Sequence, residues 1–524
     1  MVAALDFGTT YSGYSFSMRD EFVKDPLKIQ ANPVWKAGSR QFMSMKTPTC
    51  LLLDGKREFV AFGYDAENQW ADLLLDGEHE EYYYFERFKM NLHNNKNITS
   101  GMMLEDITGT KRLPAFDVFK LSIQYLVNHL LDILKTRGNV VRHNEVQWVL
   151  TVPAIWTDRA KKFMRSCAEA AGIPTKNLIL ALEPETASIF CQYLSTEKLK
   201  GSESGFTMPS EGTEYMVVDL GGGTADITVH RKAANGKLKE KHRAMGNNCG
   251  GTSIDKRFLE LFEEIVGETT MNSLKTESPL AYLDLVREFE SQKRTVETTT
   301  RIKVTMSIPV VALDEKCQKV HKKDFKTLLE SSPYSKDIKL AHDKIRINVE
   351  FFKKLFTPSI DGVISLMREI LRNRSLREVK HVLMVGGFSE CQLMQSAVRK
   401  AFPDQRIIIP EEAVMEGEER CDNIFSLIVG KDESVEAGMI VKKSFFTPYK
   451  HQDKMDIMVY VSEETTPGYV DDDRCFLLST PTITFSDTCE ERRWVDVEFV
   501  LGNTEIDLKA HDKNSGRRYR QSLI

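Results

Sequence analysis

The sequence predicts an α/β protein with two related lobes and a small β unit near its C-terminal end. Strands, glycine turns and helices alternate along residues 1–410, which is typical of α/β folds. One unit, an apolar strand, a glycine turn and a second strand, occurs at both 2–17 and 214–230 and indicates two lobes. Beyond residue 441, short alternating runs separated by Pro and Gly predict antiparallel strands. We expect lobes at 1–196 and 214–441, a connector at 197–213 and a β segment at 442–524.

Composition excludes several classes of protein. With 524 residues, of which 41% are hydrophobic, the chain can build more than one core. A formal net charge of −5 provides no global attraction to nucleic acid or an anionic membrane, so we expect neither as a partner. The nine cysteines form no Cys-x-x-Cys pair, and Cys50, Cys167 and Cys191 lie in apolar runs, which indicates reduced, buried thiols without a zinc site.

The same survey predicts where the protein resides. No apolar run reaches the roughly 18–20 residues that span a bilayer. The first glycine turn also begins too close to Met1 to leave room for a secretory signal. We therefore expect a cytoplasmic protein, with the nucleus as the alternative.

The two glycine turns indicate a phosphate site. The first reads Asp6-Phe7-Gly8-Thr9-Thr10, and the second runs from Asp219 to Asp226 with three consecutive glycines. Glycines remove every Cβ that would hold a polyanion away from the backbone. A carboxylate beside a phosphate needs a cation between them, so the flanking acids favour a Mg²⁺–phosphate site. Either turn alone is as readily an ordinary hairpin turn, but the pair favours two loops directed at one nucleotide.

The rest of the first lobe reads as alternating helices and strands. Apolar residues over 117–136 recur on one helical face that Gly138 can terminate. A strand at 146–152, a helix at 157–171 and a strand at 178–182 follow. This order indicates a strand–helix–strand unit within an α/β sheet.

Charged residues at two positions of this lobe are candidates for a site. Glu183 follows an apolar strand directly before Pro184, where α/β sheets bind ligands, although an acid at a helix start is an equal explanation. The aromatic and charged residues 80–89 predict a helix with its rings inward and Arg87 and Lys89 elsewhere. For each base taken singly, a solvated surface position is the more common role.

The second lobe repeats the theme. The turn Gly250-Gly251 leads into a helix at 254–266 whose N-terminus could offer backbone donors to a phosphate or sugar. A helix at 281–298 places Glu290, Lys293 and Arg294 on one face, for which an exposed salt-bridged stripe is the alternative. Strands at 301–312, helices at 344–373 and 390–401, and a strand at 382–385 that ends in Gly386-Gly387 complete this lobe.

Several motifs together carry a family resemblance. They are Asp6-Phe7-Gly8-Thr9-Thr10, Thr151-Val152-Pro153-Ala154, Glu183-Pro184, Asp219 to Asp226, Gly250-Gly251 and Val385-Gly386-Gly387. In order and spacing they resemble the actin-like (ribonuclease H-like) ATPase domain of the 70-kDa heat-shock chaperone family over residues 1–410. Details such as the segment at 148–156 are most similar to the divergent heat shock 70 kDa protein 12 subgroup.

The resemblance implies two lobes that hold ATP or ADP with Mg²⁺, and it implies roles for individual residues. The implied catalytic residues are Asp6, Glu183, Asp219, Thr224 and Lys89, with Arg87 as the alternative to Lys89, and Asp6 and Asp219 would hold Mg²⁺ through water. The implied nucleotide contacts are Gly8, Thr9, Thr10, Tyr11, Gly221, Gly222, Gly223, Asp226, Gly250, Gly251, Glu290, Lys293, Arg294, Gly386, Gly387 and Phe388.

We therefore expect an Mg²⁺-dependent ATP-binding, heat-shock-70-like protein with weak ATPase activity and an atypical chaperone or regulatory role. Protein clients and co-chaperone-like exchange partners are the partners that the resemblance implies. A scaffold that binds nucleotide without hydrolysing it is the first alternative, and a small-molecule kinase of the same superfamily is the second.

The sequence departs from the family pattern in two places. After Pro410 the chain is rich in glutamate where the family has a helix of small residues, which predicts poor packing of the second lobe there. The β segment resembles only a fragment of the family's peptide-binding domain, mainly at 503–510, without the helical lid. We therefore do not expect ordinary ATP-gated peptide clamping.

Overall fold

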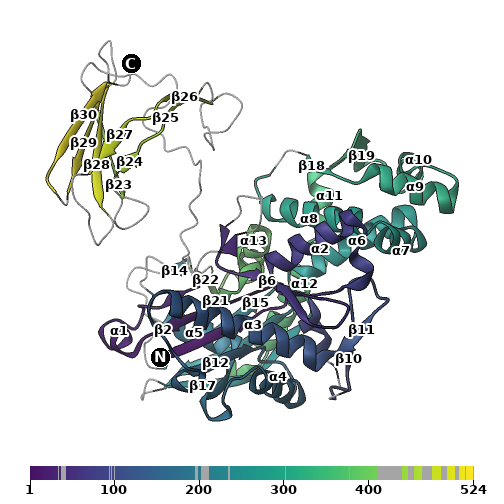
Figure 1. Ribbon diagram of the computed structural model, residues 1–524, viewed down its shortest axis with the longest axis horizontal. Helices are drawn as coiled ribbons and strands as arrows, with labels where there is room; N and C mark the ends of the chain where they lie inside the picture. Colours follow the sequence, from purple (N-terminus) through teal and green to yellow (C-terminus); the bar gives the residue numbers. More distant parts are fainter. Residues whose placement is uncertain are drawn as a thin grey trace. The chain divides into compact units, whose positions relative to one another are not determined.

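The computed structural model places the chain in two compact units, residues 1–417 and 418–524 (Figure 1). The residues that the structure describes are 1–32, 35–36, 43–93, 95, 97–99, 101–194, 199–201, 212–233, 237–300, 303–376, 378–410, 439–446, 454–462, 475–485, 493–501, 507–513 and 515–522.

The first unit contains two sheets with the same strand arrangement. In lobe I the hairpin β1 (Val2–Phe7) and β2 (Tyr11–Ser17) is followed in the sheet by β3 (Gln30–Ala31), while β12 (Gln147–Val152) and β13 (Leu178–Leu182) extend it in parallel from β1. In lobe II the hairpin β15 (Glu214–Leu220) and β16 (Ala225–Lys232) is extended by β17 (Leu238–Asn247). The parallel strands there are β21 (His381–Val385) and β22 (Arg406–Pro410), with β14 (Leu199–Lys200) at the edge. This duplication confirms the predicted two-lobed α/β architecture.

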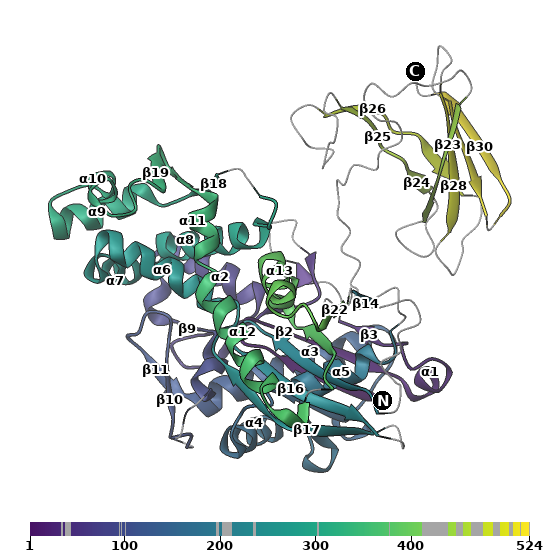
Figure 2. The same ribbon diagram turned by 180° about the vertical axis from the view of Figure 1, so that it is seen from behind.

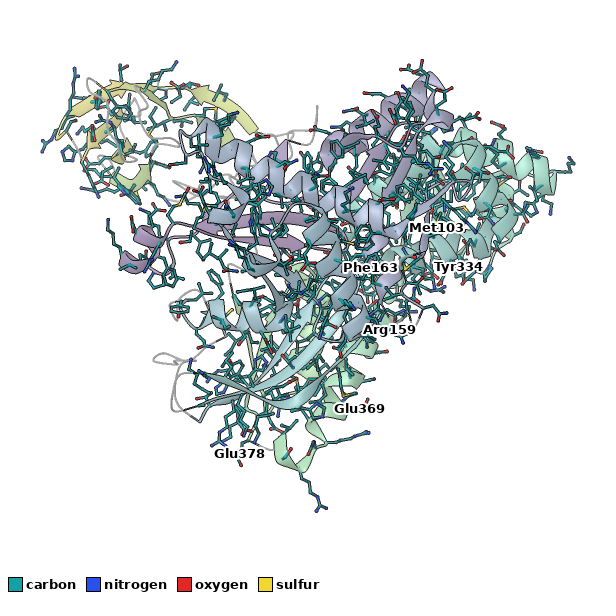
Figure 3. All side chains as sticks on the ribbon, turned by 60° about the horizontal axis from the view of Figure 1, so that its bottom comes forward. Met103, Arg159, Phe163, Tyr334, Glu369 and Glu378 are labelled. Atoms are coloured by element: carbon teal, nitrogen blue, oxygen red, sulfur yellow. The ribbon has the colours of Figure 1, made fainter. Side chains whose placement is uncertain are left out.

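Helices cover the faces of both sheets. The predicted long helix is α3 (Ala115–Thr136), which packs with α4 (Asp158–Ala170) over the first sheet. Phe163 of α4, labelled in Figure 3, meets Phe119 of α3 edge to face, and the ring centroids are 5.5 Å apart. α12 (Thr357–Leu371) and α13 (Gln392–Ala401) cover one face of the second sheet (Figure 2). α5 (Glu183–Cys191) contacts strands of both sheets and so connects the lobes.

The predicted helix over 80–89 is wrong. The segment forms the strand β9 (Tyr83–Glu86) between two short 3-10 turns, His79–Glu81 and Phe88–Leu92. β9 pairs with β7 (Cys50–Leu53), and β7 also pairs with β8 (Phe59–Phe62). Tyr84 lies opposite Leu52 and is fully buried. Pairing with an apolar strand therefore decides the conformation, because it buries the rings that a helix would have buried.

Lobe II carries an additional helical region between its strands. It contains α6 (Thr252–Val266), α7 (Glu268–Glu277), α8 (Pro279–Thr295), α9 (Val310–His321), α10 (Phe325–Ser331) and α11 (Val349–Lys354). The strands expected over 301–312 reduce to β18 (Val304–Ser307), since α9 starts directly after Pro309. The helices expected over 344–373 begin later, because 344–347 forms a strand, and Pro358 lies at the first turn of α12.

The second unit is a β structure, as the alternating pattern predicts. β23 (Met439–Phe446), β28 (Trp494–Leu501), β29 (Asp507–Asp512) and β30 (Arg518–Ser522) form an antiparallel sheet. The pairs β24 (Lys454–Asp456) with β27 (Thr482–Thr484) and β25 (Val459–Ser462) with β26 (Cys475–Ser479) accompany it. Its core includes the fully buried Val495 and Val497. The glutamate-rich segment after Pro410 and most of the predicted connector lie outside the described residues.

Two further expectations concern thiols and membranes. Cys50, Cys167 and Cys191 are buried, as predicted. In the part of the chain that the structure describes, no helix combines the length and apolarity that crossing a membrane requires.

The stacked pair Phe258–Phe289 anchors α8 to α6, with ring centroids 3.9 Å apart and an interplanar angle of 10°. We predict that Phe289→Ala lowers the free energy of unfolding of the first unit by about 3–5 kcal/mol, because it removes a buried ring and leaves a cavity. Urea unfolding followed by circular dichroism measures the loss. The neighbouring exposed Ser291 supplies the control Ser291→Ala, and equal stabilities of the two variants would contradict the prediction.

Candidate functional site

The two glycine hairpins predicted from the sequence meet in space. The turn between β1 and β2 lies against the turn between β15 and β16, although the two belong to different sheets. A Cβ added to Gly222 would overlap Thr10 Oγ1, and one added to Gly223 would overlap the side chains of Met90 and Thr9. Only glycine therefore permits this approach.

Two lysine–carboxylate pairs lie beside the hairpins. Lys46 Nζ donates to Asp6 Oδ2 at 2.5 Å, and Thr151 Oγ1 donates to Asp6 Oδ1 at 3.0 Å. Lys89 Nζ donates to Glu183 Oε1 at 2.7 Å, and the Lys89 side chain is only 3% exposed. Of the two bases that the sequence left open, Lys89 is thus the one that lies against Glu183.

The local charge is dominated by carboxylates. Burial, and then Glu183 and Asp6, raise the pKa of Asp219 to about 7, although Lys46 and Lys89 act in the opposite direction. Burial also raises the pKa of Glu183 despite its pairing with Lys89. Burial acts to raise the pKa of Asp6 as well, but Lys46 and Lys89 outweigh it and hold that pKa below its usual range. Three carboxyl groups thus lie near two lysine ammonium groups, and the two lysines pair with Asp6 and Glu183 of lobe I.

Asp226 adds to this excess. It lies directly across the hairpin from Asp219 and is 1% exposed. Burial, followed by Glu183 and Asp219, raises its pKa well above the usual range, and the Thr224 side chain hydrogen-bonds to it. Asp226 Oδ1 and Thr10 Oγ1 are buried and have no hydrogen-bond partner among the described residues. Both atoms are therefore open to a ligand or to water.

The backbone of Thr224 and of the second glycine turn closes the three-glycine turn. Gly221 N–H donates to Thr224 O at 2.9 Å. The N–H groups of Gly250, Gly251 and Thr252 donate to the carbonyls of Gly223, Gly221 and Gly222 at 3.3, 3.1 and 2.8 Å. The donors expected at this helix N-terminus for a phosphate or sugar are instead used to hold the hairpin.

Gly386 and Gly387 lie beside the same turn. Gly386 follows β21, which is parallel to β15, and has φ +82° in the region that favours glycine. A Cβ there would lie 2.5 Å from Asp219 Oδ1. Gly387 is exposed, and nothing lies within 4 Å of a Cβ built on it. Phe388 packs half-buried, 3.8 Å from a Cβ built on Gly251.

The charged stripe of α8 forms a network that reaches lobe I. Lys293 Nζ contacts Asp255 and Glu290 at 2.5 Å each, and Arg294 pairs with Glu290 at 2.8 Å. Lys293 and Arg294 outweigh the effect of burial and lower the pKa of Glu290. Glu290 and Lys293 are mostly buried in this network, whereas the Arg294 side chain is half-exposed.

Two residues of lobe I complete this network. Arg294 lies 5.4 Å from the centroid of the Tyr11 ring and donates to its hydroxyl at 3.3 Å. Arg87, with φ 52°, pairs with Asp255 Oδ2 at 3.1 Å. The residues expected on the nucleotide's adenosine side thus hold the two lobes together.

Sequence reasoning missed Lys46, Asp255 and the contact of Arg87. Lys46 directly precedes Thr47, which pairs with Ser12 of β2, and this pairing brings the lysine to Asp6. In the sequence, Lys46 is a single lysine beside Thr47-Pro48-Thr49. Its distance along the chain from Asp6 gives no indication that the two residues pair. Asp255 lies one turn into α6, where an acid is commonly explained by the helix dipole alone.

Comparison with known proteins decides the family. A family model described as Hsp70 protein matches residues 114–419. Heat shock 70 kDa protein 12A of Homo sapiens is 30% identical, over 98% of this chain and 89% of that protein. The chain belongs to the Hsp70 family. The resemblance drawn from the motifs is confirmed, and so is the actin-like ATPase fold that it implies.

The extent of the match distinguishes the 12A and 12B proteins from another member of the Hsp70 family. Heat shock 70 kDa protein 12B of Homo sapiens is 29% identical over 100% of this chain and 90% of its own length. Chaperone protein DnaK 3 of Synechococcus sp. is 25% identical, over 52% of this chain and 36% of its own length. Similarity to the 12A and 12B proteins therefore extends into the β unit, whereas that to DnaK 3 covers about half of the chain.

The raised pKa of Asp219 predicts a pH dependence of stability. Because the folded state binds the Asp219 proton more tightly than the unfolded chain, this group stabilises the fold at low pH, and the contribution is lost as pH rises towards about 7. Asp219→Asn removes this loss. We predict that, relative to the wild type, the nucleotide-free variant gains about 2 kcal/mol between pH 5 and pH 8.

Denaturant unfolding at several pH values measures this gain. The exposed Asp72 provides the matched control Asp72→Asn, for which the pH dependence should stay that of the wild type. If the free energy of unfolding depends on pH in the same way for Asp219→Asn and the wild type, the raised pKa of Asp219 is contradicted.

Proposed function

We propose that this Hsp70-family chain binds Mg·ATP between its two lobes and hydrolyses it slowly to ADP and phosphate. The observation that carries the proposal is the meeting of the Asp6–Thr10 and Asp219–Asp226 hairpins beside the pairs Lys46–Asp6 and Lys89–Glu183. Glycine backbone, cationic side chains and carboxylates in one place suit a triphosphate with its metal. Neither an ordinary hairpin turn nor a solvated face accounts for this convergence.

The residues present fit a hydrated magnesium ion. Burial raises the pKa values of Asp219 and Asp226 most, and neighbouring carboxylates raise them further, so a divalent cation would stabilise their charged forms. Within the described residues no group of three or more His, Cys, Asp or Glu is arranged to ligate a metal directly. We propose that Asp6 and Asp219 hold Mg²⁺ through water, where the ion would neutralise charge on the phosphates.

Side chains and backbone of the protein would carry the other catalytic and binding roles. Lys89 is buried against Glu183, so its ammonium group is fixed where it can stabilise charge on the transferred phosphoryl group. Glu183 would orient the attacking water. Thr224 would hold the turn through its backbone carbonyl and would hold Asp226 through its side-chain hydroxyl. The glycine turn Gly221–Gly223, with Gly8, Thr9 and Thr10 opposite, would enclose the phosphates.

The adenosine would lie between two elements of lobe II. On one side, the ribose and the base would contact α8 through Glu290, Lys293 and Arg294, with Tyr11 nearby. On the other side, they would contact Gly386, Gly387 and Phe388. The open space beside Gly387 supports this placement, because a flat ring needs backbone without a side chain. Gly250 and Gly251 would act by holding the hairpin.

The biological role follows from this chemistry as an atypical chaperone or regulatory function. Nucleotide would set the arrangement of the two lobes and thereby the contact with protein clients or exchange partners, and the compartment that we propose is the cytoplasm. A scaffold that binds ATP without hydrolysing it is the competing function. The family match over both lobes disfavours a small-molecule kinase.

We predict that Lys89→Ala slows single-turnover release of phosphate from bound ATP by about 100-fold or more, because it removes a fixed cation from the phosphoryl group. Nucleotide affinity should change much less, since catalysis here relies on charge stabilisation in the transition state. Quenched-flow measurement of phosphate gives the rate. The control Lys256→Ala removes an exposed lysine of the same protein and should leave the rate unchanged.

Three outcomes separate the functions. Slow release by the wild type that is lost in Lys89→Ala supports the ATPase. Thermal stabilisation by ATP without any release of phosphate would identify the scaffold instead. Release that continues unchanged in Lys89→Ala would contradict the assigned role of this lysine.

A further inference from the structure

A small sheet in the helical region of lobe II exposes one face to solvent. β18, β20 (Lys344–Ile347) and β19 (Ile338–Ala341) form it, with β20 in the centre. In Figures 1 and 2, β18 and β19 lie at the outer edge of the lobe near α9 and α11. One face is buried in the core through Met306, Ile345 and Ile347. The other face carries the alternate residues of each strand.

The exposed face is basic. Lys344 and Arg346 of the central strand are exposed, as is Lys339 of β19, and Lys303 directly precedes β18. Hydroxyl groups lie among these cations. The basic sheet face consists of Lys303, Thr305, Ser307, Lys339, Lys344 and Arg346, with Ala341 as a small apolar member.

The strand register places like charges directly opposite one another. Arg346 lies between Lys339 on one side and Thr305 on the other. Two cations at directly opposite positions destabilise an antiparallel pair. Within the described ranges none of the four cations has an ion-pair partner. The nearby acids are Asp343 in the hairpin turn, Asp337 directly before β19, and Glu288, which accepts from Ser307 N–H at the sheet edge. The fold thus maintains a repulsion that an external anion would relieve.

The geometry of this face selects among anions. Side chains at alternate positions of a strand repeat about every 6.6–6.8 Å. An extended peptide has the same repeat, so carboxylates at its alternate positions match Lys344 and Arg346. The face carries no aromatic ring on which a base could stack and no large apolar side chain that could enter a membrane.

We infer that the basic sheet face binds an extended acidic segment of a partner protein. The segment lies along the strands with alternate carboxylates on Lys344 and Arg346, and Lys339 adds a third cation. Thr305, opposite Arg346, and Ser307, opposite Lys344, supply hydroxyl donors beside these cations. This contact is separate from the nucleotide site and does not depend on the function proposed above.

Fluorescence anisotropy of the full chain with a labelled peptide of alternating Glu and Thr tests the inference. The wild type should bind the peptide, and added salt should weaken binding. The charge reversal Lys339→Glu with Arg346→Glu should weaken it by about tenfold or more. The double variant Lys56→Glu with Lys162→Glu makes the same charge change at exposed lysines of lobe I and should bind like the wild type.

The stability of the chain gives an independent measurement. Lys339→Gln removes one member of the opposed pair and should raise the Tm of the free protein while weakening peptide binding. No peptide binding by the wild type, or equal losses in the two double variants, would overturn the inference. Tighter binding of a thymidine oligonucleotide or of phosphatidylserine vesicles through the same residues would also overturn it, since another polyanion would then be the ligand.

Discussion

The structure depends on the concentration of negative charge where two glycine hairpins meet. Asp219 and Asp226 lie directly opposite one another in one hairpin, and Asp6 and Glu183 approach from the other lobe. Such carboxylates repel one another unless protons or cations intervene. Lys46 and Lys89, both from lobe I, compensate only in part, and the pKa of Asp219 stays raised, by burial first and then by Glu183 and Asp6. A phosphate with its magnesium ion is the chemistry that suits this imbalance.

The rest of lobe II holds that hairpin in place. The second glycine turn directs its N–H groups onto the carbonyls of Gly221–Gly223, and Gly386 approaches Asp219 where a Cβ could not fit. Backbone hydrogen bonds therefore fix the position of the acids before any ligand binds. The charged network of α8 ties this arrangement to lobe I through Tyr11 and Arg87. The glycine turns and the charged stripe of α8 are thus parts of one connection between the lobes.

Much of this could be predicted from the sequence, because the deciding information was local. Glycines between apolar strands identify a tight turn wherever they occur, and the repeat of that unit predicted the two lobes. Glu183 was found because Pro184 marks the end of its strand. The helical spacing of 117–136 depends on the chain's own periodicity, and α3 confirmed it.

What the sequence could not predict depends on distant partners. Residues 80–89 have a helix-compatible pattern, but β7 offers a strand to pair with, and tertiary pairing decided the conformation. Lys46 reaches Asp6 only because Thr47 pairs with Ser12. The second glycine turn was expected to offer backbone N–H groups to a ligand, but these groups donate to the carbonyls of the hairpin. In each case the residue type could be read from the sequence, but the residue that it contacts could not.

Isothermal titration calorimetry of the full chain with ATP, in the presence of Mg²⁺ and then with the metal chelated, tests the central claim most directly. If the excess carboxylates form a metal–phosphate site, ATP should bind saturably with Mg²⁺ and clearly more weakly without it, because the triphosphate would then face uncompensated negative charge. Absence of saturable binding, or equal affinity with and without Mg²⁺, would contradict the account.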